Sequence, residues 1–196
     1  MIKLKKIKRN NPNLLELMKI HYSNPKGFVG RNICYLIYFD SDLYGAIVGG
    51  SATLHLPNRD EFFSIVKGQL HFIVNNIFYH VHRNKNKYPI RNFTVKILLE
   101  FEKRIMIDWY NKYLDKLVGI ESLVELPRTG EVYKRAGYTC IGTTIGYTCK
   151  RVDGKGTDSW SGKRVWNTKE LRPKLVFVKK LNFNTCDKKK LTQTIF

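Results

Sequence analysis

A long amphipathic helix set among β-strand patterns places the strongest constraint on the fold of this chain. Between Thr94 and Lys116 the apolar side chains advance by three or four residues, the spacing that lines one face of an α-helix. These side chains are Leu98, Phe101, Ile105, Trp109 and Tyr113. Because such a helix buries its apolar face against another layer, we expect it to pack on a sheet built from the neighbouring strands.

Patterns on either side of this helix give the order of the other elements. Asn11 and Pro12 begin a helix that runs to Ile20, residues 60–66 form a short helix, and another short helix precedes Gly137, a left-handed C-cap. Strands are predicted at 2–7, 33–39, 43–48, 72–81, 120–126, 140–148 and 174–179. The order predicts an α/β fold of the mixed α+β kind, with a mostly antiparallel sheet flanked by helices.

The length and composition predict one domain. We expect it to span residues 1–182, with a basic loop rich in Gly and Trp at 150–173 and a flexible tail at 183–196. No stretch approaches the ~20 apolar residues that span a bilayer. Residues 1–9 also lack the apolar region of a signal peptide. We therefore expect a cytoplasmic protein with no membrane partner.

The cysteines give no sign of a metal site. They are scattered, without the paired spacing of zinc ligands. We expect them to be small buried side chains in a reducing compartment. The four are Cys34, Cys140, Cys149 and Cys186.

Excess positive charge is the main compositional signal. Lys and Arg number 35 against 16 Asp and Glu, which gives a formal charge of +19 and a pI near 9.8. Residues 1–9 carry +5 with no acid, and residues 150–190 hold 13 basic and 4 acidic side chains. Such a field concentrates polyanions. We therefore expect the partner to be double-stranded DNA, bound by the two basic ends of the chain.

One segment near the end of the domain carries a resemblance to a known superfamily. Tyr133-Lys134-Arg135-Ala136-Gly137-Tyr138-Thr139-Cys140-Ile141-Gly142 resembles the C-terminal helix, turn and strand of the GNAT acyltransferases. A closer similarity is to the Mom family of phage proteins, through His21-Tyr22-Ser23, residues 46–50, Asn75-Asn76-Ile77-Phe78 and residues 121–137. This resemblance implies a GNAT-like transferase that adds a carbamoylmethyl-type group to adenine N6 in DNA and protects phage DNA from host restriction.

Histidine and acidic residues within the resembling segments are the candidates for catalysis. Transfer to an amine requires removal of a proton, for which His21 and Tyr22 are suitable, with Ser23 beside them. The alternative for His21 is a charged cap of the preceding helix. Glu121 interrupts an apolar strand and is either a general base or metal ligand, or a partner of Arg128 or Arg135.

Further candidates lie near the same strand end or on neighbouring elements. Ser122 and Tyr133 are expected in the catalytic site with Glu121, and Asp108 on the long helix is a weaker candidate. His80 and His82 share a strand face and either join a third group around a metal or form a polar sheet face. The sequence therefore identifies neither a bound metal nor the donor of the transferred group.

Two basic segments are candidates for binding the donor and the DNA. GNAT enzymes cradle the acyl-CoA pyrophosphate with a glycine-rich loop, but residues 83–92 contain no glycine, which argues against acetyl-CoA. Their basic and amide side chains could hold another phosphate-bearing donor; we name Arg83, Arg91 and Asn92. The late loop offers side chains to neutralise phosphates or stack on bases, unless its tryptophans only anchor it to the core; we name Lys155, Trp160, Lys163, Arg164 and Trp166.

Three functions remain open at this stage. The leading hypothesis is a Mom-type DNA-modifying transferase. A non-enzymatic DNA-binding protein on the same fold is the second, favoured by the absent glycine loop. The third is an N-acyltransferase that acts on a protein or a small amine.

Overall fold

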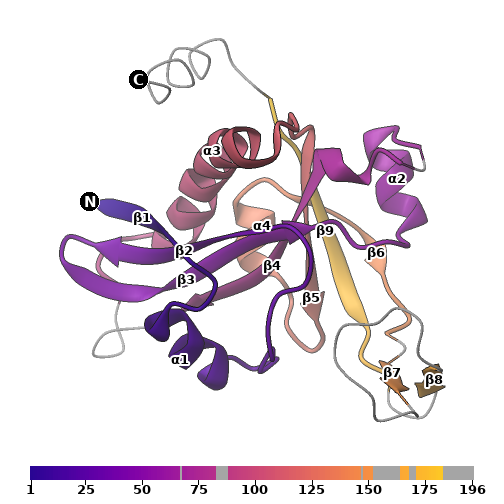
Figure 1. Cartoon of the computed structure of the whole chain (residues 1–196), viewed down its shortest axis with the longest axis horizontal. Coiled ribbons are helices and arrows are strands. Elements are labelled where there is room, and N and C mark those ends of the chain that lie inside the picture. Colours follow the sequence, from indigo (N-terminus) through magenta and orange to yellow (C-terminus); the bar gives the residue numbers. More distant parts are fainter. Residues whose placement is uncertain (67, 83–87, 147, 152–163, 168–170, 183–196) are drawn as a thin grey trace.

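Seven strands form one sheet across the whole domain (Figure 1). The computed structural model describes residues 1–182 except 67, 83–87, 147, 152–163 and 168–170. The strand order is β1-β2-β3-β4-β5-β9-β6. Their bounds are β1 Ile2–Ile7, β2 Asn32–Phe39, β3 Asp42–Ser51, β4 Ile73–Val81, β5 Gly119–Glu125, β6 Thr139–Thr143 and β9 Lys174–Lys180.

All pairings within this sheet are antiparallel except that of β4 with β5. Two further strands, β7 Thr148–Arg151 and β8 Arg164–Asn167, pair as a separate hairpin. The predicted mixed, mostly antiparallel sheet is therefore confirmed. The sequence predicts the end of a strand at residue 148 and a loop at 150–173. Since β7 and β8 lie in this region, the prediction of a loop without strands is wrong there.

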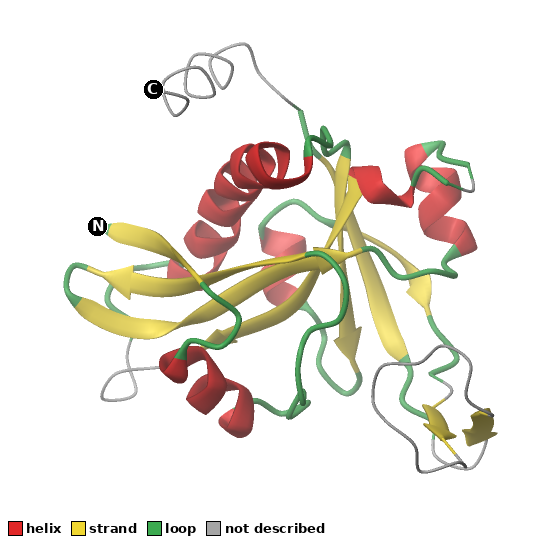
Figure 2. Cartoon of the chain, in the orientation of Figure 1, coloured by secondary structure: helices red, strands yellow, loops and turns green. Residues whose placement is uncertain are grey.

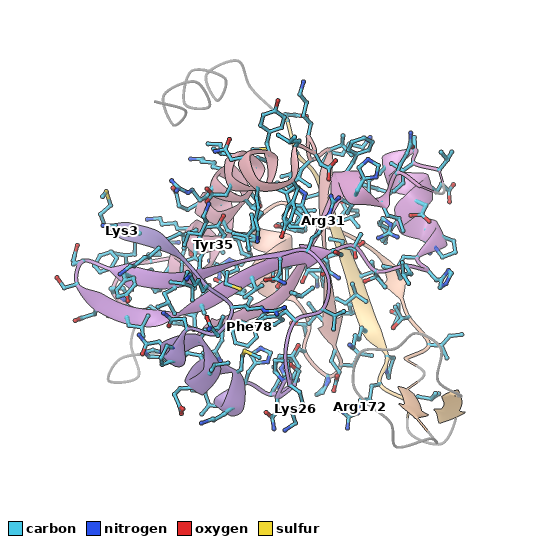
Figure 3. The ribbon with its side chains drawn as sticks, in the orientation of Figure 1. Lys3, Lys26, Arg31, Tyr35, Phe78 and Arg172 are labelled. Atoms are coloured by element: carbon cyan, nitrogen blue, oxygen red, sulfur yellow. The ribbon has the colours of Figure 1, made fainter. Side chains whose placement is uncertain are left out.

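Helices cover both faces of the sheet (Figure 2). α3 Phe93–Tyr113 and α4 Glu131–Arg135 lie on one face, where they bury the largest apolar cluster, with Tyr35 on β2 among its members. α1 Pro12–Ile20 packs on the other face against Phe78 of β4, and α2 Pro57–Phe63 packs on that face against β9. Figure 3 labels Tyr35 and Phe78 on these opposite faces.

Local sequence explains the helix ends. Asn11 accepts a hydrogen bond from the Asn13 amide at 3.1 Å, and Pro12 occupies the first turn, where its missing N–H costs nothing. Gly137 follows α4 with φ +84°, the left-handed conformation that favours glycine. In α3 the residues predicted to face the core, such as Phe101 and Ile105, are fully buried. Both predicted caps and the long helix are confirmed.

Two predictions of burial and extent need correction. Cys34 is buried, and burial raises the pKa of its thiol to about 11, whereas Cys140 is exposed. The strand expected at 140–148 ends at Thr143; beyond it the backbone still lies beside the start of β9, where the Thr144 amide donates to the Lys174 carbonyl and the Arg172 amide to the Gly146 carbonyl, both at 2.8 Å. No helix in the described part of the chain has the length and apolar character that a membrane span needs.

Candidate active site

The parallel strands β4 and β5 part soon after they meet. Only Ile73, Val74 and Asn75 pair with β5, opposite residues 119–121. β4 continues to Val81 and β5 to Glu125 without further pairing between them. The facing edges of both strands therefore keep backbone N–H and C=O groups that the sheet does not use.

A cleft of about 810 Å³ occupies this opening, and we call it the interstrand cleft. Its walls are the open ends of β4 and β5, the start of α4 and the segment that follows α1. It brings together five of the predicted catalytic residues; these are His21, Tyr22, Ser23, Ser122 and Tyr133. Segments distant in the sequence thus converge at one place, as the sequence analysis expected of them.

A buried polar cluster lies at the closed end of the interstrand cleft. Asn76 and Ser122 are the first residues beyond the last parallel pair, and both are buried. The Tyr133 hydroxyl donates to Asn76 Oδ1 at 3.3 Å, and burial raises the pKa of this tyrosine, so the hydroxyl remains a donor. Asn76 Nδ2 has no hydrogen-bond partner among the described residues. A buried N–H group without a partner is costly, which points to a ligand oxygen at this position.

His21 forms part of the cleft wall as a neutral imidazole. Its Nδ1 accepts a hydrogen bond from the Ser23 amide at 3.3 Å and lies 2.8 Å from Ser23 Oγ. Burial, together with the neighbouring His80, lowers the pKa of His21 to about 4. His21 does occupy the C-cap of α1, as the alternative expected, but with this pKa its ring is uncharged at neutral pH, so the expected charge on the cap is not supported.

Tyr22 lies at the mouth of the interstrand cleft. The Arg128 guanidinium lies 3.4 Å from the centre of its ring, a cation–π contact, and the His21 ring centre is 4.3 Å away. Burial raises the pKa of Tyr22 although Arg128 opposes this effect. The mouth is therefore basic and aromatic.

Glu121 is bound in an ion pair and does not line the interstrand cleft. Its carboxylate accepts from the Arg59 guanidinium and, at 2.6 Å, from the Thr53 amide. Both charged side chains have no exposed surface. Arg59 thus takes the place of the expected partners Arg128 and Arg135, and each carboxylate oxygen accepts a hydrogen bond, which favours the structural alternative for Glu121 over a base beside His21.

Asp108 is likewise engaged elsewhere. It lies under β1 and β2, where it accepts from Tyr35 at 2.8 Å, Arg104 at 2.8 Å and Lys6 at 3.1 Å. These bonds hold α3 to the first two strands. Asp108 does not line the interstrand cleft, so its position gives no support to the predicted catalytic role.

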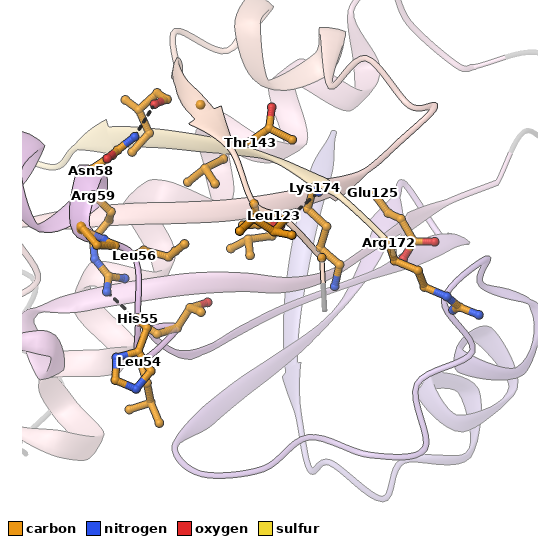
Figure 4. A pocket seen from close by; sticks show the side chains of 18 of the residues that line it. Leu54, His55, Leu56, Asn58, Arg59, Leu123, Glu125, Thr143, Arg172 and Lys174 are labelled. Atoms are coloured by element: carbon orange, nitrogen blue, oxygen red, sulfur yellow. Dashed lines mark hydrogen bonds between the residues drawn. The ribbon is translucent and has the colours of Figure 1, made fainter. Parts of the chain in front are cut away.

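A second cavity, of about 930 Å³, lies on the α2 face of the sheet, and we call it the α2 cavity (Figure 4). Its walls are mostly apolar and come from the segment before α2, from β5, from the turn after β6 and from the start of β9. The apolar lining residues are Leu54, Leu56, Pro57, Leu123, Ile141, Ile145 and Val176. Arg172 and Lys174 lie at one end of this cavity, with Glu125 beside them.

Glu125 joins the two cavities and was missed by the sequence analysis. Ser23, Leu123, Glu125 and Lys174 line both the interstrand cleft and the α2 cavity. Alternation along β5 sets Glu125 on the same face as Glu121, four residues nearer the open end. The alternation along β5 could have indicated Glu125 from the sequence. The sequence does not show where β4 and β5 part, and this point decides that Glu125 lines both cavities.

The start of α3 lies close to the interstrand cleft. The Tyr79 hydroxyl, from the cleft wall, donates to the Thr94 carbonyl at 2.7 Å. Asn92 precedes the helix in a left-handed conformation and accepts from Arg135, while its side chain makes no capping bond. Arg91 beside it is exposed. The first amides of α3 thus lie near Arg91 and Arg135, and the donor contacts expected of Arg91 and Asn92 stay a prediction.

Several predicted residues lie outside the described part of the chain. This applies to Arg83 of the donor loop and, in the late loop, to Lys155, Trp160 and Lys163. The backbone of Arg164 and Trp166 lies in β8, but their side chains are not described. Their proposed DNA contacts stay predictions.

The histidines of β4 form a row and no metal site. The ring centres of His80 and His82 are 6.4 Å apart, and His21 lies 5.8 Å from His80. Among the described residues, no group of His, Cys, Asp or Glu has the arrangement of a metal site. The alternative of a polar sheet face describes these histidines better.

Comparisons with known proteins identify the fold. No family model and no curated protein matches the chain. Three solved structures are similar to it. A GNAT family acetyltransferase from Elizabethkingia anophelis with acetyl-CoA bound is 13% identical over 92% of this chain and 98% of that chain, with a TM-score of 0.50, and the aminoglycoside 6'-N-acetyltransferase from Enterococcus faecium is 12% identical over 93% and 98% of the two chains, with a TM-score of 0.51. An acetyltransferase of the GNAT family from Streptococcus pneumoniae is 9% identical over 93% of this chain and 100% of that chain, with a TM-score of 0.52. The chain therefore has the GNAT fold, as expected from residues 133–142. Nothing in these likenesses is specific to the Mom family.

The Arg59–Glu121 pair yields a prediction on stability. Replacing Arg59 by Met leaves a buried carboxylate without its counter-charge, so R59M should lower the free energy of unfolding by about 3–5 kcal/mol in urea titrations. The double variant R59M/E121L should recover most of this loss. The exposed pair of Lys19 with Glu16 is the control, and K19M should cost less than about 1 kcal/mol. Additive losses in the double variant would contradict the pairing.

His21 yields a prediction on pH dependence. Its pKa is about 4 in the folded chain and near 6.5 when unfolded, so below pH 6.5 the unfolded chain binds the extra proton. The stability that neutral His21 contributes is complete above pH 6.5 and is lost as the pH falls towards 4. Unfolding titrations between pH 7 and 4 should show a smaller loss in H21Q than in the wild type. The exposed His55 is the control, and H55Q should keep the wild-type slope.

Proposed function

We propose that this protein is an N-acyltransferase that moves an acyl group from a CoA-type thioester to an amine. One observation carries the proposal: two cavities meet where β4 and β5 part, with Glu125 among the residues that line both. Such an arrangement lets a donor enter from one side and an acceptor from the other. The shared GNAT fold, seen in an enzyme with acetyl-CoA bound, supports the same assignment.

The interstrand cleft has features that fit an acyl-CoA donor. Beyond Asn75 and Glu121, its strand edges carry backbone groups that no neighbouring strand pairs with, and such edges suit an extended arm that carries amides. Asn76 Nδ2 is an unpaired donor at the closed end, where the thioester carbonyl would lie. The start of α3, Arg91 and Arg135 would hold the phosphates in place of the absent glycine loop. When bound, acyl-CoA supplies an activated acyl group.

Four residues of the chain would have separate roles in the transfer. Glu125 would accept the proton that the amine loses as it attacks the carbonyl carbon. Asn76 Nδ2 would donate to the carbonyl oxygen, where negative charge develops. The Tyr133 hydroxyl, kept protonated by burial, donates to Asn76 Oδ1 and holds Asn76 in this orientation. When the carbon–sulfur bond breaks, the proton accepted by Glu125 would pass to the released thiolate, which leaves as the thiol. His21 shapes the wall, because its low pKa makes it a weak base at neutral pH.

An assay of thiol release tests these roles. With acetyl-CoA and a panel of amines, E125Q should lower kcat by roughly 10²-fold or more, as expected for loss of a general base. N76L should also lower kcat by roughly 10²-fold, since it removes a donor to the carbonyl oxygen. The exposed α3 residue Glu100 is the control, and E100Q should keep wild-type activity. Failure of acetyl-CoA to bind in calorimetry would refute the proposal.

A second candidate is the Mom-type modification of adenine in DNA. The observation in its favour is the charge of +19, together with the basic aromatic mouth formed by Tyr22 and Arg128. The N-acyltransferase is preferred because it needs only the fold and the two cavities, whereas the DNA substrate depends on segments outside the described residues.

Nucleoside analysis separates the two candidates. DNA from cells that express the wild type should contain a modified deoxyadenosine if the second candidate is correct, and DNA from cells that express E125Q should not. Mass spectrometry of digested DNA detects the change. If deoxyadenosine is unmodified in both samples and the protein transfers acetyl groups to a small amine in vitro, the second candidate is excluded and the N-acyltransferase is supported.

A further inference from the structure

Two basic side chains at one end of the α2 cavity have no counter-charge bound to them. Among the described residues, neither Arg172 nor Lys174 makes an ion pair, although both line the cavity. By contrast, Arg59 at the other end is engaged with Glu121, with Asp60 at 2.6 Å and with the Thr53 carbonyl at 2.7 Å. Arg172 and Lys174 are therefore the cationic groups of this cavity that remain available to a ligand.

Glu125 does not neutralise this pair of cations. It lies opposite Lys174 in the β5–β9 register, so the two side chains share a sheet face. It makes no ion pair with a described residue, and a single carboxylate would in any case leave one of the two positive charges uncompensated. This end of the cavity thus offers one proton acceptor and two cations within one wall (Figure 4).

Most of the remaining surface of the α2 cavity is apolar, although polar side chains such as His55, Asn58 and Thr143 also line it. Leu56 and Val176 belong to the buried cluster between α2 and β9, and Leu123 and Ile141 pack against that cluster. An apolar or aromatic body would displace water from this surface favourably. A polycationic amine would instead leave the aliphatic surface uncovered and meet repulsion from Arg172 and Lys174.

We infer that the α2 cavity binds an anionic acceptor, in which an amine is joined to an apolar or aromatic body and to a phosphate or carboxylate. The anionic group lies on Arg172 and Lys174, the apolar body on Leu56, Leu123 and Val176, and the amine towards Glu125. Arginine and lysine both bind phosphate and carboxylate with charge-assisted hydrogen bonds. This inference rests on the proposed N-acyltransferase function and names the acceptor class of that site.

Calorimetric binding of matched pairs tests the inference on the full chain. AMP is compared with adenosine, and phenylalanine with phenethylamine, so that each pair differs only in its anionic group. We expect the anionic member of at least one pair to bind roughly tenfold more tightly, and the pair that responds tells phosphate from carboxylate. R172Q and K174Q should each reduce that preference by roughly threefold or more, since both side chains are partly exposed.

Controls locate the anion and separate this inference from the proposed function. K103Q, the same charge change at an exposed position on α3, should leave the preference unchanged. Loss of AMP binding in R91Q but not in R172Q would place the anion at α3 and overturn the inference, as would equal binding within both pairs. Acetyl-CoA binding is measured on the same samples. If the protein binds acetyl-CoA but shows no preference for the anionic member of either pair, only the inference is overturned. If it shows that preference but does not bind acetyl-CoA, only the proposed function is overturned.

Discussion

The buried ion pair between Arg59 and Glu121 is the interaction on which the rest of the site depends. It lies at the last paired position of β4 and β5, where Glu121 stands opposite Asn75. Two charges without exposed surface are stable only when their hydrogen bonds are satisfied, and Thr53 and Asp60 complete these bonds. The pair thereby ties the segment before α2 to the centre of the sheet. The Glu121 carboxylate, which interrupts an apolar strand in the sequence, thus stabilises the packing of this segment on the sheet.

Beyond that pair the two strands diverge, and this divergence creates a site in a fold that is otherwise closed. The interstrand cleft lies between α4 and the segment that follows α1, and it shares Ser23, Leu123, Glu125 and Lys174 with the α2 cavity. Parallel strands usually pair along their length, so the parting leaves backbone groups that no neighbouring strand pairs with, and Asn76 Nδ2 has no hydrogen-bond partner among the described residues. Unsatisfied groups of this kind are expected where a ligand completes the structure.

Local patterns predicted the elements well because their causes are local. The 3.6-residue spacing of Leu98, Phe101 and Ile105 reflects only which face of one helix is buried, and Asn11 and Gly137 act within one turn of their helices. The order of these elements, with the segment at 133–142, was sufficient to predict the GNAT fold. The convergence of His21 with Ser122 and Tyr133 was also predicted, through a family resemblance.

The sequence by itself determined the elements, their order, the excess of positive charge and most of the residues that line the interstrand cleft. Only the tertiary structure decided which acid is free: Glu121 and Glu125 share one face of β5, but Arg59, sixty-two positions from Glu121, engages the first and not the second. It also decided that Asp108 is structural, through Tyr35 and Lys6. The physical reason is that the state of a buried charge depends on partners brought by other elements, and no local pattern records them.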